Sequence, residues 1–256
     1  MVRPRQETGR QIRDLLAERP GPAIVYTSSR AKTETIAEQI AGTGCPALPY
    51  HAGLEPEQRK RNQAAFVHSE EMVIAATVAF GMGIDKPDVR TVIHAAAPKS
   101  IEAYYQETGR AGRDGDPAEA WLLWAASDFV LARQRIDAEV EPERRSQERE
   151  RLNALAAFVE TAGCRRAALL RHFGEDPPAS CGNCDNCLEP PATVDATEVA
   201  RKLLSAAFRT GQRFGAAYLA AVLAGEENEK ILKLGHDRLS VFGICDADEL
   251  TLVRPV

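Results

Sequence analysis

Four cysteines have the spacing of a metal site. Cys181, Cys184 and Cys187 are each separated by two residues, and sixteen residues lie between Cys164 and Cys181. A C-x-x-C turn brings two sulfur atoms onto one ion, and four thiolates form the closed tetrahedral shell typical of structural zinc. The spacing therefore predicts a structural ion, with no coordination position open to water.

The residues alone leave two other interpretations of these thiols open. A C-x-x-C-x-x-C run also begins the ligand sets of ferredoxin-type iron–sulfur clusters, although no further cysteine follows shortly downstream here. Free thiols are the third interpretation. Cys45 and Cys245 have no partner at metal spacing, and we expect them to be buried or incidental apolar side chains.

A second group of chemically capable residues ends the segment 76–115. Its last letters, QETGRAGRDG, place Arg110 and Arg113 three positions apart among glycines. A guanidinium grips phosphate oxygens bidentately and never loses its charge, and glycines let a phosphate approach the backbone. The alternative is the solvated basic end of a helix, which either arginine alone would favour.

The elements that position these groups follow from the hydrophobic pattern. Short apolar runs without alternation predict strands buried on both faces, and the segments between them have helical periodicity. This rhythm predicts β-α-β units and a mostly parallel sheet, whose ligands lie at the carboxyl ends of the strands. The predicted strands are residues 23–26, 47–50, 72–76, 91–94 and 119–124, and the predicted helices are residues 6–19, 29–40, 56–67, 101–108 and 127–136.

The rest of the chain is predicted to be mainly helical. A charged run at residues 142–151 begins a helix that continues through Val159, and another begins at Cys164. The last predicted elements are helices at residues 195–208 and 214–223, a small helical unit at 229–239, and a strand at 250–253 whose apolar side chains cover exposed surface.

Several segments resemble the RecQ family of superfamily 2 helicases. The segment TVAFGMGIDKPD is similar to motif V of these helicases, and YYQETGRAGRDG is similar to motif VI. The segment IVYTSSRAKTE is similar to motif IV. The segment CRRAALLRHFGE and the following CGNCDNC resemble the family's zinc-binding domain at every cysteine. The segments QRFG and GHDRLSVFG resemble the start of its winged helix, and this resemblance stops at Gly243.

The resemblance implies a fold and three domains. An α/β RecA-like lobe with a mostly parallel sheet is expected over residues 1–137. A small helical zinc-binding domain follows over residues 138–191, and an incomplete winged-helix segment over residues 192–256. For the four cysteines, the resemblance implies zinc in a structural role.

The resemblance also implies roles around a nucleotide. Arg113 would be the arginine finger on the γ-phosphoryl oxygens of ATP, with Arg110 beside it at the same phosphates. Gln106 would couple this site to closure of two lobes. Gly83 and Asp85 would lie near the nucleotide, where Asp85 could accept a hydrogen bond from a ribose hydroxyl.

Four positions would contact single-stranded DNA by the same resemblance: Ser29, Arg30, His51 and Thr77. From the residues alone, Ser29 is a good helix N-cap, and capping is its ordinary role. A lone histidine such as His51 is usually packed or on the surface, but the segment YHAGL matches a family segment that contacts the DNA backbone.

Charge and hydropathy limit the partners. The net charge is −5, so any DNA contact must come from local patches. No apolar run approaches the roughly 20 residues that span a bilayer, and the first residues lack the apolar core of a signal peptide. We therefore expect a cytoplasmic, nucleoid-associated protein without a membrane partner, whose cysteines are thiols or metal ligands.

The sequence has no G-x-x-x-x-G-K-S/T segment and no DExH box. These residues, which hold ATP phosphates and Mg²⁺, belong to a first RecA-like lobe. The resemblance implies a 3′-to-5′ DNA helicase that acts on single strands and junctions, with ATP and Mg²⁺ bound only beside such a lobe. The alternatives are one piece of a split helicase or a DNA-binding module without catalysis, and we expect no ATP hydrolysis by the isolated chain.

Overall fold

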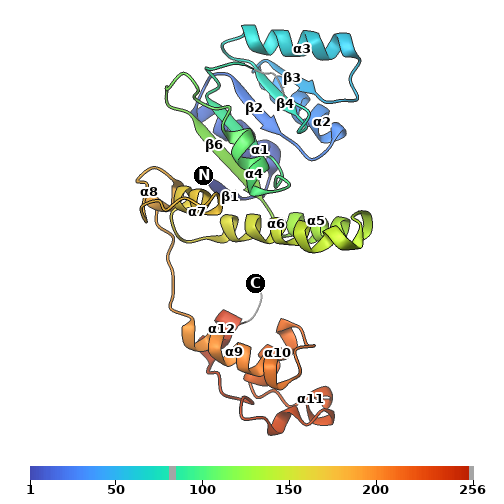
Figure 1. The fold of residues 1–256 in the computed structure, drawn as a ribbon, viewed down its shortest axis with the longest axis vertical. Helices are drawn as coiled ribbons and strands as arrows, with labels where there is room; N and C mark the ends of the chain where they lie inside the picture. The colour runs from blue at the N-terminus through green and yellow to red at the C-terminus, as the bar shows by residue number, and fades with distance from the viewer. Residues whose placement is uncertain (81–84, 254–256) are drawn as a thin grey trace. The chain divides into compact units, whose positions relative to one another are not determined.

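The computed structural model describes residues 1–80 and 85–253 (Figure 1). The chain divides into two compact units, Met1–Pro191 and Ala192–Val256. Among the described residues, no helix combines the length and the apolar composition needed to cross a bilayer.

The first unit is built on a sheet in which the described strands follow the order β1-β6-β5-β2-β4-β3. The described pairings are all parallel, as the strand–helix rhythm predicted. β2, β4 and β5 are buried at every residue, which explains why their sequences show no alternation. The strands are β1 Val2–Pro4, β2 Ala23–Tyr26, β3 Ala47–Tyr50, β4 Val73–Ala76, β5 Thr91–His94 and β6 Glu119–Trp124.

Helices cover both faces of this sheet. On one face, Ile12 of α1 and Ile36 of α2 pack against Val25 of β2. On the other face, Phe66 of α3 packs against Ile24 of the same strand. Alternate residues of β2 thus serve two separate cores, as in a three-layer α/β domain. The helices are α1 Thr8–Glu18, α2 Arg30–Ala41, α3 Pro56–His68 and α4 Ile101–Thr108.

A helical extension packs on the α4 side of the sheet. Leu155 and Phe158 of α6 are buried against Tyr104 of α4 and Leu122 of β6. This apolar contact fixes the helices that carry the cysteines to the sheet. The helices are α5 Ala126–Glu139, α6 Pro142–Glu160, α7 Arg165–His172 and α8 Asp185–Leu188.

The second unit has a core of its own. Ala206 of α9, Leu223 of α10 and Ile231 of α11 are fully buried in it. Its elements are α9 Thr197–Arg209, α10 Ala216–Leu223, α11 Glu229–Lys233, the short 3-10 turn His236–Arg238, and α12 Ala247–Val253.

The prediction of a strand at residues 250–253 is wrong, because these residues end α12. Asp246 and Glu249 form a capping box at its start. The Asp246 carboxylate accepts the Glu249 N–H at 2.8 Å, and the Glu249 carboxylate accepts the Asp246 N–H at 3.1 Å. The box stabilises α12, and this helix places Val253 in the apolar core of the unit.

Candidate functional site

The structure brings the four predicted metal ligands together. The Sγ atoms of Cys164, Cys181, Cys184 and Cys187 all lie within 4.8 Å of one another. The Cys164–Cys184 pair is 3.9 Å apart and the Cys181–Cys187 pair 4.0 Å. Zn–S bonds of about 2.3 Å in a tetrahedron place sulfur atoms about 3.8 Å apart. The cluster therefore fits one tetrahedral ion, and the distances are far too long for disulfides.

Local hydrogen bonds prepare the sulfur atoms of Cys181 and Cys187 for the thiolate form, whereas burial raises the pKa of Cys164 to about 11. Burial alone would raise the pKa of Cys181, but the backbone N–H groups of Asn183 and Cys184 donate to its sulfur and lower that pKa. The Ser180 hydroxyl donates to Cys187 at 3.2 Å and lowers its pKa to about 6. Because metals bind thiolates, these donors favour metal binding at neutral pH.

One carboxylate anchors the cysteine loops. Both oxygens of Asp185 share the N–H of Arg165 Nε, at 2.7 and 2.9 Å, and Oδ2 also accepts the backbone N–H of Val2 at 2.9 Å. The Arg165 guanidinium also donates to the Phe158 carbonyl at 2.8 Å. Asp185 thus ties the loop of Cys184 to the end of α6 and to the edge strand β1. This link was not predicted from the sequence.

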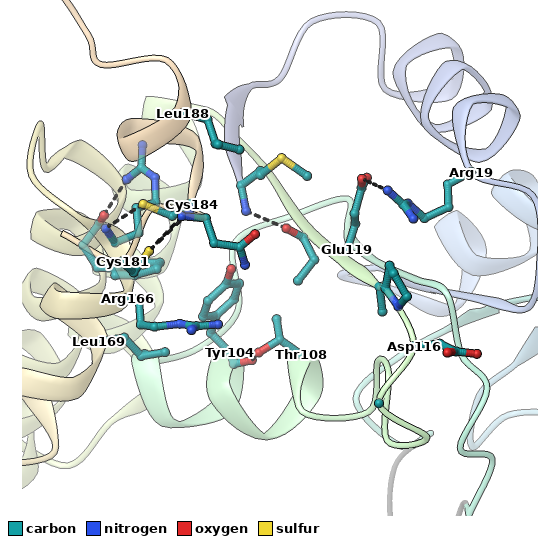
Figure 2. A pocket seen from close by; sticks show the side chains of 18 residues that line it. Arg19, Tyr104, Thr108, Asp116, Glu119, Arg166, Leu169, Cys181, Cys184 and Leu188 are labelled. Carbon is teal, nitrogen blue, oxygen red and sulfur yellow. Dashed lines mark hydrogen bonds and ion pairs between the residues drawn. The ribbon is translucent and has the colours of Figure 1, made fainter. Parts of the chain in front are cut away.

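A cleft of about 750 Å³ separates this anchored cluster from the rim of the sheet (Figure 2). Figure 2 shows Cys181 and Cys184 on one side and Glu119 of β6, paired with Arg19, on the other. Tyr104 of α4 also lines the cleft. The cleft therefore borders the metal cluster, and only two of the four cysteines line it.

The two predicted phosphate-binding arginines lie on a loop that directly follows α4. Gly112 has φ 63°, and its N–H donates to the Val89 carbonyl at 3.0 Å. A Cβ at this position would lie 2.9 Å from the Cβ of Ala118. Asp114 of the same loop forms an ion pair with Arg90. The glycine and the ion pair together pin the loop to the segment that precedes β5.

The arginines have different surroundings. Arg113 is held loosely, with its Nε donating to the Gly109 carbonyl at 3.1 Å and its Nη1 lying 3.8 Å from Asp85. The Nε of Arg110 is buried and has no hydrogen-bond partner among the described residues. Arg110 lies close enough to Tyr26 to oppose the rise of its pKa to about 12, which burial causes. A buried cationic donor without an acceptor is rare, and it favours an anionic ligand.

Asp85 and Gln106, the other predicted nucleotide-site residues within the described ranges, are both exposed. Asp85 reaches Arg113 as described, and Gln106 lies on α4, four positions before Arg110. Gly83 lies outside the described residues.

The predicted DNA contacts follow three neighbouring strands at their carboxyl ends. The Ser29 hydroxyl caps α2 by accepting the Lys32 N–H at 3.3 Å. Arg30 is exposed, and its guanidinium lies so close to Gly53 that a Cβ there would be 3.0 Å from it. Thr77 follows β4 directly and is half-buried. Parallel strands bring these positions to one edge of the sheet.

His51 is a packed residue. Its side chain is 4% exposed, its Nε2 lies 3.1 Å from the Glu34 carboxylate, and its Nδ1 accepts the Gly53 N–H at 3.2 Å. Both ring nitrogens are therefore occupied within the chain. His51 holds the turn after β3 against α2 and so supports Arg30 beside it.

The comparison with known proteins covers almost all of the chain. Three family models match consecutive parts: the helicase conserved C-terminal domain residues 7–115, the RecQ zinc-binding domain residues 126–188, and the RQC domain residues 190–255. The chain belongs to the RecQ family. The RQC match reaches residue 255, so the expectation that the resemblance stops at Gly243 is wrong. The zinc-binding match includes all four cysteines and supports zinc over an iron–sulfur cluster.

The relatives are much longer than this chain. The ATP-dependent DNA helicase RecQ of Pasteurella multocida is 46% identical over 232 residues, which are 91% of this chain and 37% of that protein. The RecQ helicase of Bacillus subtilis is 41% identical over 221 residues, again 37% of its length. Among solved structures, a DEAD box protein from Methanococcus jannaschii aligns with 54% of this chain and 38% of its own, at 24% identity and a TM-score of 0.45.

Proposed function

We propose that this chain is the second motor lobe, zinc-binding domain and RQC segment of an ATP-dependent DNA helicase that moves 3′ to 5′. The observation that carries the proposal is the loop with Arg110 and Arg113. It offers a buried guanidinium Nε without an acceptor and a second, loosely held guanidinium. The RecQ family membership and the names of the relatives support the same reading.

In this proposal, the arginine loop acts on a nucleotide that another lobe holds. The ion pair of Arg113 with Asp85 breaks, and Arg113 then stabilises the charge that develops on the γ-phosphoryl oxygens. Arg110 binds the same phosphate group. A first RecA-like lobe supplies the phosphate loop and the ligands of Mg²⁺. Two arginines cannot cradle a triphosphate or hold Mg²⁺, so the isolated chain does not hydrolyse ATP.

DNA is bound at the carboxyl-end edge of the sheet in this proposal. Ser29, Arg30 and Thr77 bind backbone phosphates of a single strand there. The zinc ion holds together the helical segments beside this lobe that carry the cysteines. Closure of the two lobes on ATP, relayed through Gln106, moves the strand. This activity places the protein at the nucleoid in the cytoplasm.

The proposal is tested by DNA-stimulated ATP hydrolysis, measured for the chain alone and for the chain joined to the first lobe of a RecQ relative. We expect no turnover by the chain alone and DNA-stimulated turnover by the joined protein. Arg113→Ala should lower that turnover by about a thousandfold or more, with zinc content and unfolding unchanged. Turnover by the chain alone that Arg113→Ala abolishes would overturn the requirement for a first lobe.

A second candidate function is DNA binding without catalysis, alone or as one piece of a split helicase. It is favoured by the cysteine cluster and its Asp185 anchor, because this chain supplies every residue of both. DNA binding by the chain, together with no turnover after joining to a first lobe, would select this candidate.

A further inference from the structure

Tyr26 is a buried tyrosine beside the arginine loop. It is the last residue of β2 and 3% exposed, and its hydroxyl donates to the Phe80 carbonyl at 3.1 Å. Because both partners of this hydrogen bond are buried, breaking it would leave two polar groups without a partner. The hydroxyl therefore keeps one direction. A tyrosine oxygen that donates its own proton can still accept a hydrogen bond from another group.

The ring of Tyr26 is held from a second side. It stacks on the ring of His94, with 5.2 Å between the centroids and 23° between the planes. His94 in turn is paired with Glu107 in the last turn of α4, at 2.6 Å. Tyr26 therefore cannot change its rotamer without losing contacts to β5, and it has a fixed place relative to the arginine loop.

The arginine loop lies close to this fixed hydroxyl. Ala111 packs against the core cluster that contains Tyr26 and Phe80. The preceding residue, Arg110, is half-buried, and its Nε has no acceptor among the described residues. Burial raises the pKa of Tyr26 to about 12, and the nearby charge of Arg110 opposes this rise. A hydroxyl oxygen that can still accept a hydrogen bond thus lies near a guanidinium that lacks an acceptor.

We propose that Tyr26 is a positioning residue for Arg110. Its hydroxyl oxygen accepts a hydrogen bond from the Arg110 guanidinium when a phosphate group binds, and the other N–H groups of Arg110 are then directed at the phosphate oxygens. Without this acceptor, the guanidinium would also adopt orientations that miss the phosphate. The inference rests on the proposed function, because the phosphate belongs to the nucleotide that the first lobe holds.

The test is ATP turnover by the chain joined to the first lobe of a RecQ relative, at saturating oligothymidylate. We expect Tyr26→Phe to lower kcat roughly ten- to a hundredfold, because a misdirected guanidinium stabilises the transition state less. The KM for ATP should change much less, since the phosphate loop of the first lobe binds the substrate. A Tyr26→Phe protein with the kcat of the wild type would overturn the inference.

A double-mutant cycle separates positioning from a merely structural role. If Tyr26 acts through Arg110, Tyr26→Phe should have little further effect on kcat in a protein that already carries Arg110→Ala. A tyrosine that only stabilises the sheet would lower kcat by the same factor in both backgrounds, and that result would overturn the inference. Single-turnover hydrolysis of radiolabelled ATP keeps the slow variants measurable.

The matched control is Tyr50→Phe. Tyr50 ends β3 as Tyr26 ends β2, and its ring also packs on Phe80, with 4.6 Å between the centroids. Its hydroxyl reaches Gln63 instead, at 3.4 Å. We expect the control to leave kcat close to that of the wild type. A loss equal to that of Tyr26→Phe would overturn the inference, because removal of either hydroxyl beside Phe80 would then have the same effect.

The proposed function and the role of Tyr26 fail in different ways. A joined wild-type protein without DNA-stimulated turnover would overturn the proposed function itself. Normal turnover together with an additive cycle would overturn only the positioning by Tyr26. Thermal unfolding shows whether each variant is folded, and turnover is compared at a temperature well below the lowest unfolding midpoint.

Discussion

His94 and Glu107 form a buried pair in which Nε2 and Oε2 lie 2.6 Å apart. The pair joins the last residue of β5 to the last turn of α4, and the two side chains are 1% and 11% exposed. Tyr26 of β2 stacks on the His94 ring at 5.2 Å between centroids. Because Arg110 follows Glu107 by three residues, the pair fixes the base of the arginine loop to the middle of the sheet.

Replacing Glu107 with Ala should lower the free energy of unfolding by about 1–3 kcal/mol, because the buried His94 ring would lose its partner. Glu107→Gln should cost less, since an amide can still bond to the ring. Urea unfolding measures both. The control is Gln106→Ala, one position earlier and exposed. Equal losses at both positions would show that the pair contributes nothing beyond its place in the helix.

Local patterns in the sequence were enough to predict most of the sheet. β2 and β3 have the predicted bounds, because unbroken apolar runs bounded by turn residues leave no other short element. The edge strand β1 was not predicted. It has three residues, two of them Arg3 and Pro4, and its form comes from its pairing with β6 alone, which no local pattern encodes.

The candidate site was predictable where spacing within one segment sets the chemistry. Cys181, Cys184 and Cys187 are such a case, because C-x-x-C turns bring their sulfur atoms together, whereas Cys164 is held beside them by the contact of Arg165 with Asp185. The pair of His94 with Glu107 was missed because strand register and helix packing create it across 13 residues. The helix α12 was missed for another reason. The residues of its capping box are visible in the sequence, but the apolar residues that follow them led to the prediction of a strand.

Replacing Cys184 with Ser should remove the bound zinc. We expect about one zinc per wild-type chain, and much less in the variant, because three thiolates leave the tetrahedral shell open. Metal content by atomic spectroscopy and the thermal unfolding midpoint measure the effect. Cys45→Ser, a matched thiol outside the cluster, should keep both values. A variant of Cys184 with full zinc content and unchanged unfolding would contradict the assignment.

Replacing Asp185 with Asn should loosen the cysteine loops while leaving every thiol in place. Arg165 would lose its charge partner, and the amide NH₂ that replaces one carboxylate oxygen cannot accept a hydrogen bond. We expect faster zinc release to a chelator and faster amide exchange in β1 than in the wild type. Unchanged release would show that the four sulfur atoms alone set the metal site's stability.

Glu102 links α4 to α7 and makes stability depend on pH. A hydrogen bond from the Ser100 side chain and a second from His172, 2.9 Å away, lower the pKa of Glu102 from 4.5 to about 2. A carboxylate whose pKa is lower in the folded than in the unfolded state stabilises the fold at pH values above its unfolded-state pKa. That contribution is therefore complete above about pH 5 and disappears as pH falls from 4.5 toward 2.

Glu102→Gln should thus destabilise the chain near neutral pH and have a shrinking effect toward about pH 3. The Glu102 side chain is 43% exposed, so solvent screening limits the difference to less than about 1 kcal/mol. Urea unfolding at several pH values measures it. The control, Glu57→Gln, removes an exposed carboxylate paired only with Lys60 of its own helix. A constant difference between Glu102→Gln and wild type at all pH values would mean that Glu102 acts through packing, because a charge effect must vanish once both states are protonated.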